Sequence, residues 1–131
     1  MTAAPTLPNM LLVEPQFVMR RTMVTVGREL RIVDFQEATS VARAQALLES
    51  RRFGGLVLDM GDGPEALALL EQLRAGMFPS PADLPVIALT YVPPPAMVAS
   101  RLAGFEPRHT LRKPFKVGEL LESVAAIRAA G

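Results

Sequence analysis

Four polar side chains stand at or beside the ends of short apolar segments that have the composition of buried β-strands. One such residue alone would carry little information, since Asp is common in the turn that follows a strand. Four in succession favour a shared site, because the carboxyl ends of parallel strands meet at one edge of a sheet. The segments are NMLLVE (9–14) with Glu14, GLVLD (55–59) with Asp59, LPVIALT (84–90) with Thr90, and HTLRKP (109–114) with Lys113.

These four residue types suit the transfer of a phosphoryl group to a carboxylate. Carboxylate and phosphate repel each other, and a hard divalent cation such as Mg²⁺, which prefers oxygen ligands, can screen that repulsion. Asp59 would serve as nucleophile and metal ligand, with Glu14 as a second acid. Lys113 would place a positive charge near the phosphoryl oxygens, and the Thr90 hydroxyl would donate a hydrogen bond to one of them.

The chain alternates between strand-like and helix-like segments, which predicts βαβ units and a parallel sheet covered on both faces. The second helix is expected to be capped by Thr39 or Ser40, and the first to end near Gly27. Right-handed crossovers leave few topologies for such an α/β fold. Among them is a flavodoxin-like (βα)5 three-layer sandwich with five parallel strands in the order 2-1-3-4-5, which we take as the prediction. The predicted strands are 9–14, 31–35, 55–59, 84–90 and 109–114, and the predicted helices are 16–30, 39–52, 64–76, 95–104 and 117–130.

Length and composition limit the functional classes. The 131 residues suit one domain, predicted over 9–130 after a short tail (1–8). The 14 basic and 13 acidic side chains nearly cancel, so neither nucleic acid nor an anionic membrane is an expected partner. There is no cysteine, and the first residues lack the pattern of a signal peptide. We therefore expect a cytoplasmic protein.

In the order and spacing of four segments, the sequence resembles the receiver domains of two-component response regulators. The segments that carry the resemblance are LLVE, LVLD, PVIALT and LRKPF, from the first, third, fourth and fifth predicted strands. The resemblance implies that Asp59 is the phosphoacceptor, Thr90 the switch hydroxyl and Lys113 the lysine that pairs with the phosphoryl group. It also implies Mg²⁺ bound by Glu14, Asp59 and the backbone carbonyl of Gly61.

The same resemblance implies further features of structure and partners. The peptide bond before Pro114 is expected to be cis. A histidine kinase or a histidine phosphotransfer protein would supply the phosphoryl group, docking on the first helix. A downstream protein would bind the face formed by 95–104, 109–114 and 117–130, and a homodimer is also compatible with this fold.

Four departures from the receiver pattern cluster around the predicted site. Pro15 replaces the second of two adjacent acids, and the loop MGDG (60–63) is shorter than usual. Tyr91 replaces a small residue and could shield Asp59, and Thr110 occupies the position of a switch aromatic. We therefore predict that Mg²⁺ binds weakly or no longer binds.

Several residues allow two interpretations from sequence alone. Asp62 could replace the missing metal ligand or could cap the helix that follows it. The apolar residues of the first helix cover more than one face, which fits either a docking surface or a deeply buried helix. His109 is interpreted as a surface residue, and the pairs Arg20–Arg21 and Arg51–Arg52 as solvated.

Three functional classes are compatible with an acidic residue at the end of a buried strand. The preferred class is a stand-alone receiver that accepts a phosphoryl group on Asp59 and signals by protein contacts, with no turnover beyond weak self-phosphorylation and dephosphorylation. The alternative is a degenerate receiver that acts as a phosphorylation-independent interaction module. A phosphatase of the haloacid dehalogenase type is disfavoured, because Gly61 stands where that family needs a second Asp.

Overall fold

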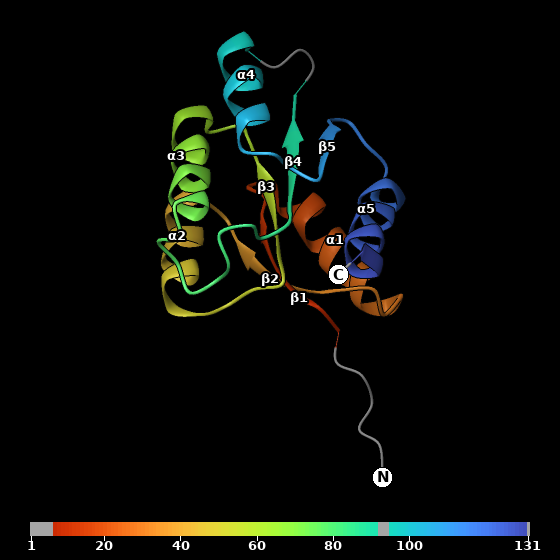
Figure 1. Ribbon diagram of the computed structural model, residues 1–131. Helices are drawn as coiled ribbons and strands as arrows, with labels where there is room; N and C mark the ends of the chain where they lie inside the picture. Colours follow the sequence, from red (N-terminus) through yellow and green to blue (C-terminus); the bar gives the residue numbers. More distant parts are fainter. Residues whose placement is uncertain (1–6, 92–94, 131) are drawn as a thin grey trace.

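Five strands alternate with five helices in the computed structural model, which describes residues 7–91 and 95–130. Of the predicted tail, only residues 7 and 8 fall within these ranges. The elements, shown in Figure 1, are β1 (Asn9–Val13), α1 (Phe17–Glu29), β2 (Asp34–Ala38), α2 (Val41–Ser50), β3 (Gly55–Asp59), α3 (Gly63–Arg74), β4 (Val86–Thr90), α4 (Ala96–Gly104), β5 (His109–Arg112) and α5 (Val117–Ala130).

The strands form one parallel sheet in the order β2-β1-β3-β4-β5, which confirms the predicted fold class. The register aligns the carboxyl ends of the strands: Val13 lies opposite Leu58, Asp59 opposite Leu89, and Thr90 opposite Arg112. The ends of β1, β3, β4 and β5 therefore meet at one edge of the sheet.

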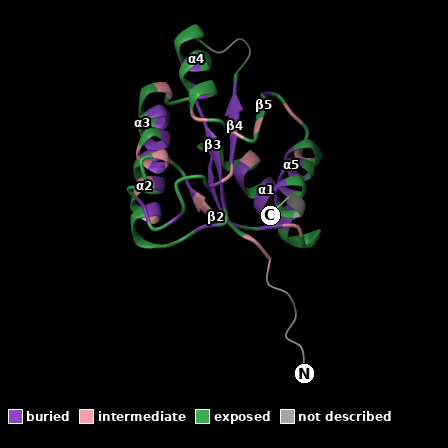
Figure 2. Cartoon of the chain, viewed as in Figure 1, coloured by how far each residue is buried: buried purple, intermediate pink, exposed green. Residues whose placement is uncertain are grey.

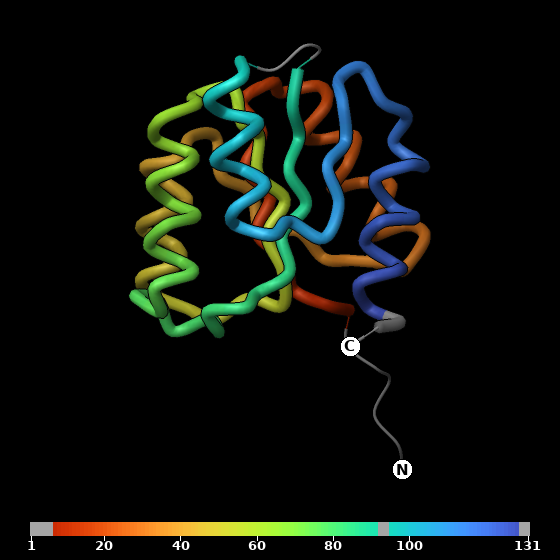
Figure 3. The backbone as a smooth tube through the Cα atoms, turned by 45° about the horizontal axis from the view of Figure 1, so that its top comes forward, coloured from red at the N-terminus to blue at the C-terminus, as the bar shows by residue number. Residues whose placement is uncertain are grey.

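Helices cover both faces of the sheet, and each face has its own apolar core. Side chains of α2, α3 and α4 pack on one face, and those of α1 and α5 on the other. Figure 3 shows the same arrangement from a second direction, with α4 running alongside α3. The central strands β3 and β4 are buried along their whole length (Figure 2), as expected for parallel strands covered on both sides.

Helix α1 is buried along a single stripe, made by Arg20, Met23, Val24 and Gly27. Outside this stripe, Met19 and Val26 are partly buried against the core, whereas Phe17 and Val18 reach solvent, with exposed fractions of 68% and 75%. The interpretation of α1 as a helix buried more deeply than usual is therefore wrong. Its use as a docking surface stays a prediction.

The second strand was predicted over 31–35 and lies at Asp34–Ala38. The difference arises at the end of α1, which continues past Gly27 to Glu29. The next residues complete the helix end: Arg31 has a φ of 56°, and the amides of Ile32 and Val33 both donate to the Gly27 carbonyl. The β-branched pair therefore belongs to a helix-terminating turn, and the strand begins only after it.

Gly27 itself serves packing. A Cβ placed on it would lie 2.9 Å from Cγ1 of Val33, so only glycine lets this segment pack closely against α1.

Of the two predicted caps of the second helix, Thr39 and Ser40, the structure has Ser40, whose hydroxyl accepts from the Arg43 amide at 3.2 Å. In the described ranges, no helix combines the length and apolarity needed to cross a bilayer.

Candidate functional site

The four residues singled out from the sequence are all buried at the carboxyl edge of the sheet. Their exposed fractions are 0% for Glu14, 4% for Asp59, 3% for Thr90 and 9% for Lys113. Glu14 follows β1, Asp59 and Thr90 end β3 and β4, and Lys113 follows β5. Polar side chains are buried at this depth only when they are paired.

Lys113 pairs with both acids. Its Nζ lies 2.7 Å from Oε2 of Glu14 and 2.6 Å from Oδ2 of Asp59. Burial lowers the pKa of Lys113, but its contacts with Asp59 and Glu14 outweigh this effect, so the net pKa is raised above 10.5. The ammonium is therefore charged at neutral pH and partly neutralises the two carboxylates.

The remaining carboxylate oxygens are held by backbone amides. The Gln16 amide donates to Oε1 of Glu14 at 3.1 Å, and the Gly61 amide donates to Oδ1 of Asp59 at 2.8 Å. Oδ2 of Asp59 differs, because it accepts no hydrogen bond of good geometry even though Lys113 is close. Asp59 is thus held by the Gly61 amide at one oxygen and by the charge of Lys113 at the other.

Thr90 joins the site through its backbone. Its carbonyl accepts from the Lys113 amide at 2.7 Å, which ties the end of β4 to the residue after β5. The residue also lines a cavity of about 180 Å³ between α4 and β5, together with Leu102 and Thr110. The predicted contact of its hydroxyl with a phosphoryl group stays a prediction.

Tyr91 lies over the site. Nζ of Lys113 is 5.4 Å from the centre of the Tyr91 ring, within the range of a cation–π interaction. A Cβ placed on Gly61 would lie 3.4 Å from the same ring and 2.7 Å from Oδ1 of Asp59. The ring therefore packs beside the loop that follows Asp59, and 47% of the residue faces solvent.

Several solved structures of similar shape are response regulators or their receiver domains. The receiver protein from Pseudomonas putida has a TM-score of 0.79 and 23% identity, over 94% of this chain and 99% of that chain. The receiver domain of Francisella response regulator 1452 has a TM-score of 0.78 and 22% identity, over 94% and 98%. A response regulator from Thermotoga maritima has a TM-score of 0.75 and 21% identity, over the same shares. The chain has the receiver fold. No protein-family model and no curated protein sequence matches it.

The receiver fold raises the question of a metal ion, and the structure offers two carboxylates as candidate donors. The carboxylates of Glu14 and Asp59 are oxygen ligands of the kind that Mg²⁺ prefers. The ammonium of Lys113, however, already pairs with both of them. Within 7–91 and 95–130 there is no group of three or more acidic, His or Cys residues placed to hold a metal.

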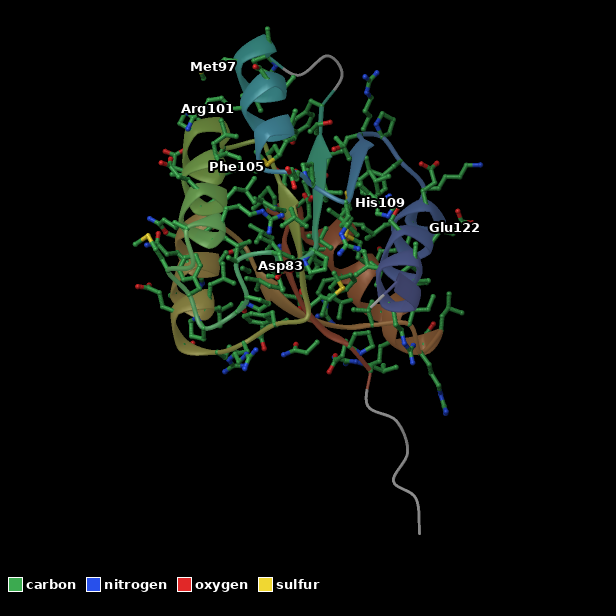
Figure 4. All side chains as sticks on the ribbon, viewed as in Figure 1. Asp83, Met97, Arg101, Phe105, His109 and Glu122 are labelled. Carbon is green, nitrogen blue, oxygen red and sulfur yellow. The ribbon has the colours of Figure 1, made fainter. Side chains whose placement is uncertain are left out.

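Asp62 does not replace the acidic metal ligand that is lost at Pro15. It is exposed at the start of α3, outside any three-residue metal group of the described chain. It also does not cap the helix through its side chain; its backbone carbonyl instead accepts from the Glu65 amide. The Lys113–Pro114 bond is cis, as predicted. His109, which is labelled in Figure 4, was predicted as a surface residue and is partly exposed on the edge strand β5.

Arg20 is the residue that sequence reasoning placed wrongly. It was expected on a solvated face with Arg21, yet only 8% of it is exposed. The spacing could have indicated its burial, because Arg20 lies three, four and seven residues before the buried Met23, Val24 and Gly27 and so on the same face of the helix. A charged residue in the buried stripe of a helix needs a partner, and Arg20 finds one in Glu37 of β2.

Proposed function

We propose that this chain is a response regulator receiver that accepts a phosphoryl group on Asp59 and signals through protein contacts. The observation that supports this most is the state of the Asp59 carboxylate. Its Oδ1 accepts from the Gly61 amide, and its Oδ2 lies 2.6 Å from the buried ammonium of Lys113. A carboxylate held at both oxygens is already oriented before the reaction, with a positive charge beside the oxygen that would attack.

In the proposed transfer, Oδ2 of Asp59 forms a bond to phosphorus while the bond from phosphorus to the leaving group breaks. With acetyl phosphate as donor, acetate leaves and an aspartyl phosphate remains. Lys113 would then pair with a phosphoryl oxygen, and the Thr90 hydroxyl would donate to another. Bound weakly by Glu14, Asp59 and the Gly61 carbonyl, Mg²⁺ would screen the charge between acid and phosphate.

The proposal includes protein partners at two surfaces. A histidine kinase or histidine phosphotransfer protein would approach α1, where Phe17 and Val18 expose apolar surface. A downstream protein, or a second copy of the chain, would bind the face of α4, β5 and α5. Figure 4 shows Met97 on α4 and Glu122 on α5 at the outside of the molecule. We propose a cytoplasmic location and no role in multiple-turnover catalysis.

Exposure to acetyl phosphate tests the proposal. Intact-mass analysis should show the gain of one phosphoryl group in the wild type and none in Asp59→Asn. Asp62→Asn is the matched control, because Asp62 is an exposed acid three residues away that does not touch Lys113, and it should label like the wild type. Mg²⁺ should increase the rate only at high concentration.

Two results would count against the proposal. Equal labelling of the wild type and Asp59→Asn would place the reaction elsewhere. A wild type that is folded yet takes up no phosphoryl group from acetyl phosphate, with or without Mg²⁺, would favour the degenerate receiver.

A further inference from the structure

Arg20 contacts three segments at once. Its Nε pairs with Oε1 of Glu37 at 3.0 Å, which ties α1 to β2. Its Nη1 donates to the carbonyl of Glu14 at 3.0 Å and lies 3.5 Å from the carbonyl of Pro15. The guanidinium also lies 5.6 Å from the centre of the Phe17 ring. A planar group with several donors suits this arrangement better than a lysine would.

The contact with Glu14 leads directly to the candidate site. The carbonyl that accepts from Arg20 belongs to the same residue whose carboxylate pairs with Lys113. On its amide side, Glu14 is tied to β2 by a bond to the Ala38 carbonyl at 3.2 Å. On its carbonyl side, Glu14 is held by Arg20, whose Nη1 also lies near the carbonyl of Pro15 in the turn that follows.

We propose that Arg20 is a positioning residue for the acidic site: with Glu37, it fixes the turn after β1 and so sets the Glu14 carboxylate against Lys113. Glu14 in turn shares the ammonium that lies beside Oδ2 of Asp59. Arg20 therefore influences how strongly the Lys113 ammonium pairs with each of the two acids, although Arg20 does not itself pair with Asp59. This inference rests on the proposed phosphorylation of Asp59 for its effect on rate, but not for its effect on Lys113.

Arg21 offers a matched control in the next position. It pairs with the other oxygen of Glu37, so both arginines share one partner. Arg21 is exposed, and its ion pair does not extend to the turn that holds Glu14. Exposed ion pairs of this kind contribute little to stability. A comparison of Arg20→Gln with Arg21→Gln therefore separates the loss of the hydrogen bond to the Glu14 carbonyl from the loss of one positive charge near Glu37.

Two measurements test the proposal at a temperature where thermal unfolding shows each variant to be folded. The first is the NMR signal of the Lys113 ammonium, which reports on Glu14 from the far side of the site. Arg20→Gln should shift this signal and speed its exchange with water, while Arg21→Gln leaves it unchanged. The second is the rate of labelling by acetyl phosphate, which Arg20→Gln should lower by about tenfold or more, since small misplacements in a reacting site are costly. Arg20→Lys should bring both the Lys113 signal and the labelling rate part of the way back to the wild-type values.

The outcomes separate this inference from the proposed function. If Arg20→Gln is less stable but its Lys113 signal matches that of the wild type, Arg20 only stabilises the fold and the inference fails. If the wild type takes up no phosphoryl group, the proposed function fails, and the Lys113 signal still decides the role of Arg20. Should Arg20→Gln not fold, Arg20→Lys and Glu37→Gln provide the same comparison, and an unchanged Lys113 signal in both would overturn the proposal.

Discussion

Glu14 and Asp59 are buried carboxylates that share one ammonium, that of Lys113. Two like charges held close together without solvent are costly, and the pairing with Lys113 offsets this cost. Lys113 is therefore expected to matter for stability as well as for the proposed chemistry.

Removal of Lys113 should destabilise the protein. Lys113→Met leaves two buried acids without a counter-ion, and we expect the free energy of unfolding at neutral pH to fall by about 3 to 5 kcal/mol. Lys116→Met is the control, because Lys116 is exposed nearby and should have little effect. Urea unfolding of both variants checks this prediction, and equal stability of the two would contradict it.

The same pairing predicts a pH dependence. The pKa of Lys113 is raised in the folded protein, so its contribution to stability is complete below the unfolded value of 10.5. That contribution is lost as the pH rises through the higher folded value. The stability difference between the wild type and Lys113→Met should therefore be constant near neutral pH and shrink above pH 10.5. A difference that grows in this alkaline range would have the wrong sign.

Tyr91 should slow access to Asp59. Its ring contacts the site at Lys113 and Gly61, and Oδ2 of Asp59 is shielded from solvent. Tyr91→Ala should therefore speed labelling by acetyl phosphate without loss of the fold. The exposed Met97 on α4 supplies the control variant Met97→Ala, which should label at the wild-type rate. Stopped-time intact-mass analysis compares the rates, and identical rates for all three proteins would exclude a shielding role.

At the level of elements, the ends of β1, β3 and β4 could be predicted because each apolar run stops at a polar residue. The start of β2 could not be, because Ile32 and Val33 have strand-forming side chains but are used by the turn that ends α1. The burial of Arg20 was not predicted for a related reason. A charged side chain is expected at the surface unless its partner on another element is known. Local sequence patterns do not contain such tertiary contacts.

Gly27 provides a test at this scale. Gly27→Ala would bring a methyl group to within 2.9 Å of Val33, and we expect a loss of about 1 to 3 kcal/mol in the free energy of unfolding. Gly118→Ala in α5 meets open space and should instead stabilise by up to about 1 kcal/mol. Chemical denaturation measures both. A Gly27→Ala protein as stable as Gly118→Ala would show that this close approach is not needed.

At the level of the whole molecule, the strand order explains how residues distant in the chain form one site. Glu14 and Lys113 are 99 positions apart, yet they pair because β1, β3, β4 and β5 end at the same edge of the sheet. Strand alternation left few topologies, this one among them, and the strand order 2-1-3-4-5 in turn predicted the grouping of the four residues. That Lys113 pairs with both acids, and that the Tyr91 ring lies beside it, could not be predicted from the sequence and is seen only in the structure.

The identity of the residue that takes up the phosphoryl group can be determined directly. After treatment with acetyl phosphate, borohydride reduction converts an aspartyl phosphate to homoserine, which fragment-ion mass spectrometry can locate in the sequence. If Asp59 is the phosphoacceptor, homoserine appears at position 59 in the wild type, with no conversion at that position without the phosphodonor. Homoserine at position 62 instead, or no conversion at any residue of a folded protein, would contradict this assignment.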